Sequence, residues 1–404
     1  MIPDDHVSVR HASIPMDKKA NTCRFCTGHN LRRLASYADY PIFIGCSDKP
    51  RHDDALYEFA LYLCRDCGGI QQLTLPPLEI LYGERRFFGG GRVWQQHYDA
   101  FHDFITANLR DGASLLEIGG GTGSMLKRFV AGGRMLRLHD VEPHPEYALP
   151  DVTIFRNYFD LDFDTDARFD VIYSSHLIEH LSDVPAFFAK TRTLLKESGS
   201  LFTACPNILE SFKALHLNAF TTDHFNYFSP PVLAQIAAEH GFVVRRYSMF
   251  RDHGMYFEFV AAGRDALRID GEVRRKAVAE LDREFETYIE TLNAFAADTA
   301  ARIMGPTFLY GAHAFTITFL RHLPLGLSYR AVLDNEPTKQ WRRLCGTDLQ
   351  CLPPAVLSEE REPTVLVYMG AYTGEIVEQL KAINPAVRLL RLDEFAAAHG
   401  IAKN

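Results

Sequence analysis

Residues 115–126 read LLEIGGGTGSML, and this stretch decides the fold of the region around it. An apolar run typical of a buried strand leads into the glycines, and a helix-like apolar pattern follows them. Closely spaced glycines let the chain turn tightly and let a ligand contact bare backbone. The following helix would offer its first N–H groups and the positive end of its dipole. The stretch therefore predicts a ligand site between a strand and a helix.

The same strand-and-helix alternation continues on both sides of a long amphipathic segment. From residue 114 to about residue 262, strand-like and helix-like segments follow one another with short connections. This alternation predicts an α/β fold with a doubly wound, mostly parallel sheet. We expect a long linking helix over residues 264–304, and a second, smaller α/β unit over residues 305–404.

Composition limits the classes of protein that this chain can represent. The chain has 404 residues, is 47% hydrophobic and carries a net charge of −8. Its length favours two or three domains. It lacks a long basic run, an apolar run of about 20 residues and a signal-peptide core, so we expect no nucleic-acid or membrane partner and a cytoplasmic location. A small molecule is the expected partner, and the oligomeric state stays open.

The spacing of the glycines and the acidic residues near them favour a ribose-containing cofactor other than a dinucleotide. Rossmann dehydrogenases also carry glycines at this point, but their third glycine would fall on position 124, which is serine here. Glu117 stands just before the first glycine, and Glu142 ends the next strand in HDVEP, where a carboxylate can bond ribose hydroxyls. The alternative is a glycine turn that closes the fold without any cofactor.

Four of the eight cysteines form two CxxC pairs, Cys23 with Cys26 and Cys64 with Cys67. Two such pairs can supply four thiolates to one tetrahedral zinc ion, and four protein ligands make the site structural. Buried free thiols or redox pairs are the alternative. The other cysteines lack such spacing and are expected to be small core residues.

Three segments in order resemble the class I S-adenosylmethionine-dependent methyltransferases: EIGGGTG, DVEP and FDVIYSSHLIEHL. The resemblance implies that Glu117 lies by the methionine part of the cofactor and that Glu142 binds its ribose. It also implies that Gly119, Gly121 and Gly123 present backbone to the cofactor. His176, after the following strand, would flank the same molecule.

The whole chain resembles the sugar C-methyltransferases that act on nucleotide-linked keto-sugars. The similarity spans about residues 21–395, and its C-terminal part rests on FLYGAHA, VLDNEPTKQ, CGTDL and VLVYMGAYTGEI. It implies the following order: a flexible tail (1–20), a zinc-binding module (21–82), an S-adenosylmethionine-binding core (83–263), a linking helix (264–304) and a C-terminal Rossmann-like α/β domain (305–404). The last domain would bind the nucleotide or sugar, or would serve as a structural lid.

The family reaction removes a proton next to a keto group, and the enolate carbon then attacks the sulfonium methyl. In the segment TTDHFNYFSP, His224 stands where the family has its histidine base, and Asp223 can orient it. A family tyrosine is replaced by Thr221. His180 and Glu179 are further catalytic candidates; the alternative is that one of the two histidines of SSHLIEHL, His176 and His180, packs on the adenosine and the other caps a helix.

One more departure and two alternative functions accompany this prediction. Phe87 and Phe88 stand where the family carries polar residues, and Arg85, Arg86 or Arg92 could bind a diphosphate or lie on the surface. Tyr227 and Phe228 are expected in the core. The leading prediction is C-methylation of a nucleotide-linked 4-keto-deoxysugar. The alternatives are O- or N-methylation of a sugar or another small molecule, and a catalytically inactive binding protein.

Overall fold

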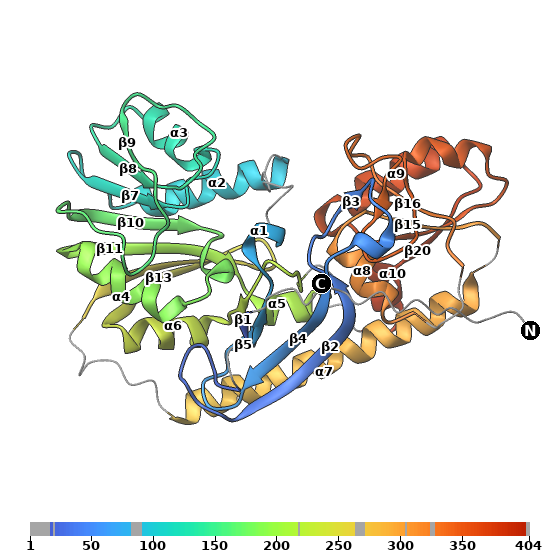
Figure 1. Cartoon of the computed structure of the whole chain (residues 1–404), viewed down its shortest axis with the longest axis horizontal. Helices are drawn as coiled ribbons and strands as arrows, with labels where there is room; N and C mark the ends of the chain where they lie inside the picture. Colours follow the sequence, from blue (N-terminus) through green and yellow to red (C-terminus); the bar gives the residue numbers. More distant parts are fainter. Residues whose placement is uncertain are drawn as a thin grey trace, which may run out of the picture.

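A computed structural model gives the fold of the chain (Figure 1). It describes residues 17–18, 21–81, 91–216, 219–262, 271–303, 305–323 and 328–400. Figure 1 shows one α/β lobe on each side, with the N-terminal strands between them and the helix α7 (Gly271–Arg302) running beneath. Within the described residues, none of the helices is both long enough and apolar enough to span a membrane.

The first lobe contains a seven-stranded sheet in the order β13-β14-β11-β10-β7-β8-β9. The bounds of its strands are β7 Ser114–Ile118, β8 Arg137–Val141, β9 Val152–Phe155, β10 Phe169–Ser175, β11 Leu195–Pro206, β13 Phe242–Phe250 and β14 Gly254–Ala261. β9, β8, β7, β10 and β11 are parallel, while β14 runs antiparallel to both of its neighbours. The predicted doubly wound, mostly parallel sheet is therefore confirmed.

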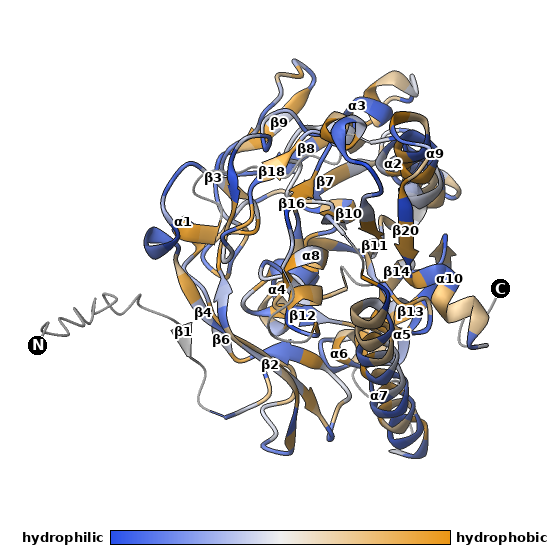
Figure 2. Cartoon of the chain, turned by 90° about the vertical axis from the view of Figure 1, so that its right-hand side faces the viewer, coloured by the Kyte–Doolittle hydropathy of each residue, from blue (hydrophilic) through white to orange (hydrophobic). Residues whose placement is uncertain are grey.

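Helices cover both faces of this sheet because its strands are apolar on both sides. Leu115 packs with α2 (Arg92–Thr106) and α3 (Ser124–Ala131) on one face, whereas Leu116 faces the core that includes α4 (Val184–Leu194) and α6 (Pro230–Glu239). Neighbouring residues of a strand point to opposite faces, so a continuous apolar run buries both. Figure 2 shows this hydrophobic character on the central strands such as β7.

The N-terminal module is a small antiparallel sheet that borrows a strand from the core. Its strands β2 (Leu31–Pro41), β4 (Leu56–Cys64) and β5 (Ile70–Gln72) are followed by β12 (Asn226–Tyr227) in the order β12-β5-β4-β2. Smaller elements complete it: β1 Asp17–Lys18, β3 Cys46–Ser47, η1 Arg51–Asp53, β6 Thr74–Leu75 and α1 Leu78–Leu81. Most of the predicted tail, residues 1–20, lies outside the described residues.

The C-terminal lobe has its own five-stranded parallel sheet in the order β18-β16-β15-β19-β20. Its elements are β15 Thr307–Tyr310, α8 Ala314–Leu320, β16 Ala331–Leu333, β17 Arg343–Leu344, β18 Cys351–Leu352, η4 Pro354–Glu359, β19 Thr364–Val367, η5 Gly370–Tyr372, α9 Thr373–Ile383, β20 Arg388–Arg391 and α10 Leu392–Ala398. The described helix α7 falls inside the expected range 264–304, of which residues 264–270 and 304 lie outside the described part.

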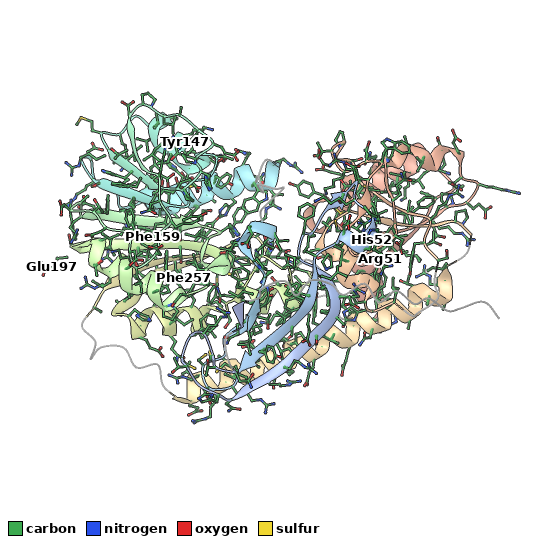
Figure 3. All side chains as sticks on the ribbon, in the orientation of Figure 1. Arg51, His52, Tyr147, Phe159, Glu197 and Phe257 are labelled. Carbon is green, nitrogen blue, oxygen red and sulfur yellow. The ribbon has the colours of Figure 1, made fainter. Side chains whose placement is uncertain are left out.

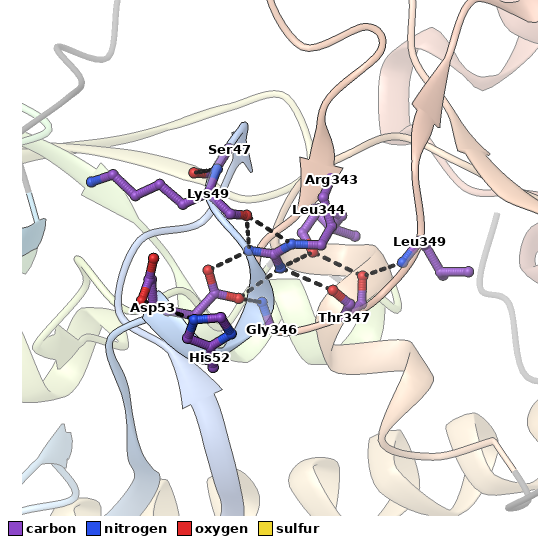
Figure 4. Close-up of polar contacts among 10 residues, drawn as sticks. Ser47, Lys49, His52, Asp53, Arg343, Leu344, Gly346, Thr347 and Leu349 are labelled. Carbon is purple, nitrogen blue, oxygen red and sulfur yellow. Dashed lines mark hydrogen bonds and ion pairs between the residues drawn. The ribbon is translucent and has the colours of Figure 1, made fainter. Parts of the chain in front are cut away.

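The N-terminal module also binds the C-terminal lobe directly. β3 pairs antiparallel with β17, and the Arg343 guanidinium donates to both carboxylate oxygens of Asp54 at 2.7 Å. The same guanidinium reaches the backbone oxygen of Lys49 at 2.9 Å (Figure 4). Figure 3 accordingly places Arg51 and His52 beside the C-terminal lobe and away from Tyr147 in the core. The module thus contacts both lobes and links them to each other.

Candidate active site at the carboxyl edge of the core sheet

The glycine loop after β7 forms a cradle with open space above one residue. Gly121 has φ +51°, and a Cβ built on it would meet nothing within 4 Å. Gly123 has φ +70° at the N-terminal boundary of α3, where a Cβ would lie 2.7 Å from the Tyr147 ring. Position 123 needs glycine for its backbone conformation and its close packing, whereas position 121 leaves backbone exposed to a ligand.

Two carboxylates from β8 and the loop after it hold this glycine loop in place. The Gly120 N–H donates to Asp140 Oδ1 at 3.1 Å, and the Gly121 N–H donates to Glu142 Oε2 at 3.1 Å. Glu142 also accepts from the His144 N–H at 2.9 Å. The predicted ribose ligand Glu142 therefore lies beside the glycines, as the sequence suggested. Asp140 was missed, although its place two residues before Glu142 in HDVEP was a usable signal.

The third carboxylate of this region, Glu117, is buried in the sheet. The Tyr173 hydroxyl donates to its Oε2 at 3.2 Å. Burial, with the neighbouring Asp140 charge, raises the pKa of Glu117 well above its ordinary value. Burial likewise raises the pKa of Asp140 to about 7. Both carboxyls therefore hold protons more readily than ordinary glutamate and aspartate side chains do, and a cationic sulfonium nearby would favour their charged forms.

Aromatic and imidazole rings pack around His176, which directly follows β10. His176 has φ +51°, an unusual backbone for a non-glycine residue and a mark of functional sites. Its ring lies 4.8 Å from those of both Trp94 and His97. His97, which sequence reasoning missed, is buried with Nε2 2.8 Å from the Ser175 hydroxyl. Burial lowers the pKa of His97 to about 2, so this ring is neutral.

The loop after β10 brings two predicted residues, His176 and Glu179, into contact. His176 Nδ1 lies 3.0 Å from Oε1 of the buried Glu179, so the nitrogen donates to the carboxylate. Burial would raise the pKa of Glu179, but the His176 hydrogen bond and nearby histidines bring it below its ordinary value. Oε2 of this ionised carboxylate has no hydrogen-bond partner among the described residues. It is therefore an acceptor that a bound molecule can satisfy.

The segment 219–228 carries the predicted base next to this loop. The His180 and His224 rings meet edge to face at 4.8 Å. His180 Nδ1 lies 2.8 Å from the Asp223 backbone oxygen, which can only accept, so Nδ1 carries a proton and donates it to this oxygen. Burial lowers the pKa of His224 to about 4, which keeps this ring neutral at pH 7. A neutral imidazole in this position can accept a proton.

Asp223 and Thr221 complete the constellation. The Thr221 hydroxyl donates to Asp223 Oδ1 at 2.5 Å. Burial raises the pKa of Asp223, but His224, His180 and the Thr221 hydroxyl lower it more, so the carboxylate is charged. Thr221, which departs from the family tyrosine, thus acts on Asp223. Glu179, His180 and His224 each have one side-chain atom that could bind a metal ion, and these three atoms lie within 4.8 Å of one another.

The N-terminal module fixes the backbone of this candidate catalytic segment. The fully buried Gln72 of β5 donates from Nε2 to the backbone oxygens of His224 at 2.7 Å and of Thr222 at 3.2 Å. On the other side, Asn226 Nδ2 donates to the Leu181 backbone oxygen at 2.7 Å. The Phe225 N–H donates to the Glu179 backbone oxygen at 2.8 Å. The segment is therefore held between the N-terminal module and the loop after β10.

The four paired cysteines converge on one point of the N-terminal module. Cys23 Sγ lies 3.6 Å from Cys67 Sγ, and Cys26 Sγ lies 3.6 Å from Cys64 Sγ. Tetrahedral zinc with Zn–S bonds of about 2.3 Å requires sulfur separations of about 3.8 Å. The sulfurs also receive N–H donors, including Gln71 Nε2 at 3.1 Å from Cys23. These donors are the outer partners that a thiolate cluster needs.

The other predicted residues have clear positions where the structure describes them. Tyr227 and Phe228 are buried, which confirms their expected place in the core. Arg92 is exposed and pairs with Glu375 of the C-terminal lobe at 2.6 Å. Arg85, Arg86, Phe87 and Phe88 lie outside the described residues. A surface cavity of about 260 Å³ opens at the opposite edge of the sheet, beside Arg110 and Asp170, and so lies apart from the candidate site.

The C-terminal lobe also gathers polar groups at the carboxyl edge of its sheet. Asp334, after β16, accepts from the Ala312 N–H at 2.9 Å and from Lys339 Nζ at 2.8 Å. His313 caps α8 by accepting from the Phe315 N–H at 3.2 Å. Asp334 and His313 are thus engaged in holding their own loops. This edge is where ligands bind in parallel sheets.

Comparison with known proteins identifies the core. Residues 91–247 match a family model described as a methyltransferase domain. C-methyltransferase NovU of Streptomyces niveus is 24% identical over 393 residues, covering 89% of this chain and 92% of NovU. With the class I fold and the glycine cradle, these findings make the protein an S-adenosylmethionine-dependent methyltransferase.

Two solved structures are similar to part of the chain. One is the 1,6-didemethyltoxoflavin-N1-methyltransferase of Burkholderia thailandensis, with 16% identity, a TM-score of 0.36, and coverage of 43% of this chain and 82% of that chain. The other is the glycopeptide N-methyltransferase MtfA in complex with S-adenosylmethionine, with 15% identity, a TM-score of 0.34, and coverage of 41% of this chain and 93% of that chain.

Proposed function

We propose that the protein is a C-methyltransferase that acts on a nucleotide-linked 4-keto-deoxysugar through an enolate. The observation that carries this proposal is the neutral, half-buried His224 packed against His180 beside the charged Asp223. Carbon methylation needs a base to remove a proton next to the keto group. The similarity to NovU along most of both chains supports carbon as the methylated atom.

Each residue of the site has a proposed role in this reaction. His224 takes the proton, and Asp223 stabilises the imidazolium that forms. His180 and the unpartnered Oε2 of Glu179 hold the acceptor's polar groups. The enolate carbon then forms a bond to the methyl carbon as the carbon–sulfur bond breaks, which leaves S-adenosylhomocysteine. Charge is neutralised in this step, so the buried surroundings favour it.

S-adenosylmethionine supplies the electrophilic methyl group, and the glycine loop holds it. Gly119, Gly121 and Gly123 present backbone, and Glu142 accepts from the ribose hydroxyls while it braces Gly121. Glu117 lies toward the methionine part, and His176 flanks the cofactor. The open space above Gly121 supports this assignment.

We further propose that Cys23, Cys26, Cys64 and Cys67 bind one structural Zn²⁺. The support is their sulfur separations and the lack of disulfides among the described cysteines. The proposed domains keep the boundaries 21–82, 83–263 with the helix 264–304, and 305–404. In this arrangement the C-terminal lobe binds the nucleotide or sugar part of the acceptor.

One assay in deuterated water tests the proposed reaction. The protein is incubated with a panel of nucleotide-linked 4-keto-deoxysugars, with and without S-adenosylmethionine, and the products are read by mass spectrometry and NMR. We expect a carbon-bound methyl group, and deuterium uptake at the neighbouring carbon without the cofactor. A methyl ether or methylamine without exchange would instead support the O- or N-methyltransferase alternative.

A further inference from the structure

Three side chains outside the proposed catalytic set meet near the carboxyl edge of the core sheet. His216 Nε2 lies 2.9 Å from Asp252 Oδ2, and His253 Nδ1 lies 2.8 Å from Asp252 Oδ1. The two imidazole rings are 4.2 Å apart, and the ligand atoms of all three residues lie within 4.8 Å of one another. Two imidazoles and one carboxylate therefore converge although 36 residues separate His216 from Asp252.

The backbone around the cluster is arranged to bring these side chains together. His216 follows α5 (Ile208–Lys213), its N–H donates to the Ser211 oxygen at 2.8 Å, and the Tyr288 hydroxyl donates to its backbone oxygen at 3.1 Å. Leu215 and Arg251, each next to the cluster in sequence, have φ of +54° and +53°. Non-glycine residues in this region cost about 1–3 kcal/mol each, so surrounding contacts must hold them there.

The donor set matches the preferences of one class of ion. Imidazole nitrogen with one carboxylate suits Zn²⁺ and its first-row neighbours, whereas Mg²⁺ and Ca²⁺ prefer oxygen ligands only. The side chains of His216, His253 and Asp252 are 10%, 40% and 57% exposed. One ligand is thus anchored in the interior, while the other two face outward and leave room for an exogenous ligand.

We propose that His216, Asp252 and His253 bind a divalent transition-metal ion of the Zn²⁺ class with an open coordination position. This site is separate from the four cysteines, which leave no such position. It lies at the ligand edge of the core sheet, because Gly254, next to His253, pairs with Pro206 at the carboxyl end of β11.

An ion there would face the edge of the sheet where the cofactor and acceptor meet. Its open position would take an oxygen of the acceptor, such as a hydroxyl or a phosphate. That last role rests on the proposed function, whereas the metal site itself does not. A methyltransferase that acts on another acceptor would still bind the ion.

Metal binding to the full-length protein tests the proposal. The purified protein, with zinc at the cysteine site, is titrated with Co²⁺ and followed by absorption spectroscopy, and total metal is measured by mass spectrometry. We expect one further equivalent with the weak visible bands of nitrogen and oxygen ligands and without thiolate charge-transfer bands. His216→Ala and His253→Ala should weaken this equivalent by at least about 100-fold, since even loss of an outer partner costs about 10–100-fold.

Matched variants separate this site from the other histidines. His52→Ala removes an exposed histidine that also neighbours an aspartate, with His52 Nε2 3.5 Å from Asp53 Oδ1, and should bind Co²⁺ like the wild type. Asp252→Asn keeps the side-chain volume and should also lose the ion. The proposal is overturned if the wild type takes up no further equivalent, or if His224→Ala abolishes it while His216→Ala does not. The second result would place the ion at Glu179, His180 and His224.

Discussion

Replacing Gln72 with leucine should uncouple the catalytic segment from the N-terminal module. Gln72 is fully buried, and its amide group bridges two parts of the chain. Nε2 donates to the backbone oxygens of His224 and Thr222, while Oε1 accepts from the Tyr57 hydroxyl at 2.9 Å. Leucine has a similar volume but offers none of these contacts. The change therefore leaves three buried polar groups without their partner.

The size of the effect follows from those three hydrogen bonds. Each is worth about 1 kcal/mol net, and a buried group left unpaired costs about 1–3 kcal/mol, so we expect the free energy of unfolding to fall by about 3 kcal/mol. Because misplacing a catalytic group by about 1 Å can cost about 100-fold in rate, kcat should fall by about that factor. Affinity for S-adenosylhomocysteine should stay unchanged, since the glycine loop makes none of these contacts.

The neighbouring glutamine provides the control. Gln71 donates to Cys23 Sγ instead of to the catalytic segment, so Gln71→Leu should weaken zinc binding by about 10–100-fold and leave kcat near the wild-type value in excess zinc. The assays are methyl transfer, calorimetric binding of S-adenosylhomocysteine, and denaturant unfolding. If Gln72→Leu keeps full kcat, or if it weakens cofactor binding as much as turnover, the N-terminal module does not position the base.

Three further predictions concern the cofactor, the base and the interface between the lobes. Glu142→Gln should raise the Kd of S-adenosylhomocysteine by about 10–100-fold, because hydrogen bonds to a charged group are worth about 1.5–3 kcal/mol; calorimetry showing less than about a threefold change would contradict the ribose assignment. Since burial lowers the pKa of His224 to about 4, kcat/KM should stay level on acidification to about pH 5 and fall near pH 4. The unfolded histidine titrates near ~6.5, so acidification between the two pKa values also destabilises the fold, and an activity midpoint near ~6.5 would argue against His224 as the base. Asp54→Ala leaves the Arg343 guanidinium without its carboxylate partner, in a pair whose side chains are 15% (Arg343) and 5% (Asp54) exposed. It should lower the free energy of unfolding by about 3–5 kcal/mol in denaturant titration; a loss below about 1 kcal/mol would show that the pair is solvated.

Local patterns predicted the elements that depend on neighbours in sequence. The apolar run before the glycines gave β7, and the left-handed turn that the glycines permit begins α3 directly afterwards. The CxxC spacing indicated two sulfur pairs because each knuckle closes within a few residues. Glu142 was identifiable because the end of a parallel strand lies at the ligand edge of its sheet. In each case the deciding interaction spans only a short stretch of chain.

The tertiary structure decided which distant groups share a site. His97 contacts His176, and Gln72 braces His224 from a different module, yet in sequence both are ordinary polar residues within an amphipathic helix or a short strand. The pairing of β12 with β5 depends on a contact between segments about 150 residues apart, as does the position of the base. The sequence by itself determined the class I core and the candidate ligands of each loop. Only the folded chain determined which of these groups meet and how deeply they are buried. Long-range packing brings His216 to Asp252, and burial sets the pKa of His224.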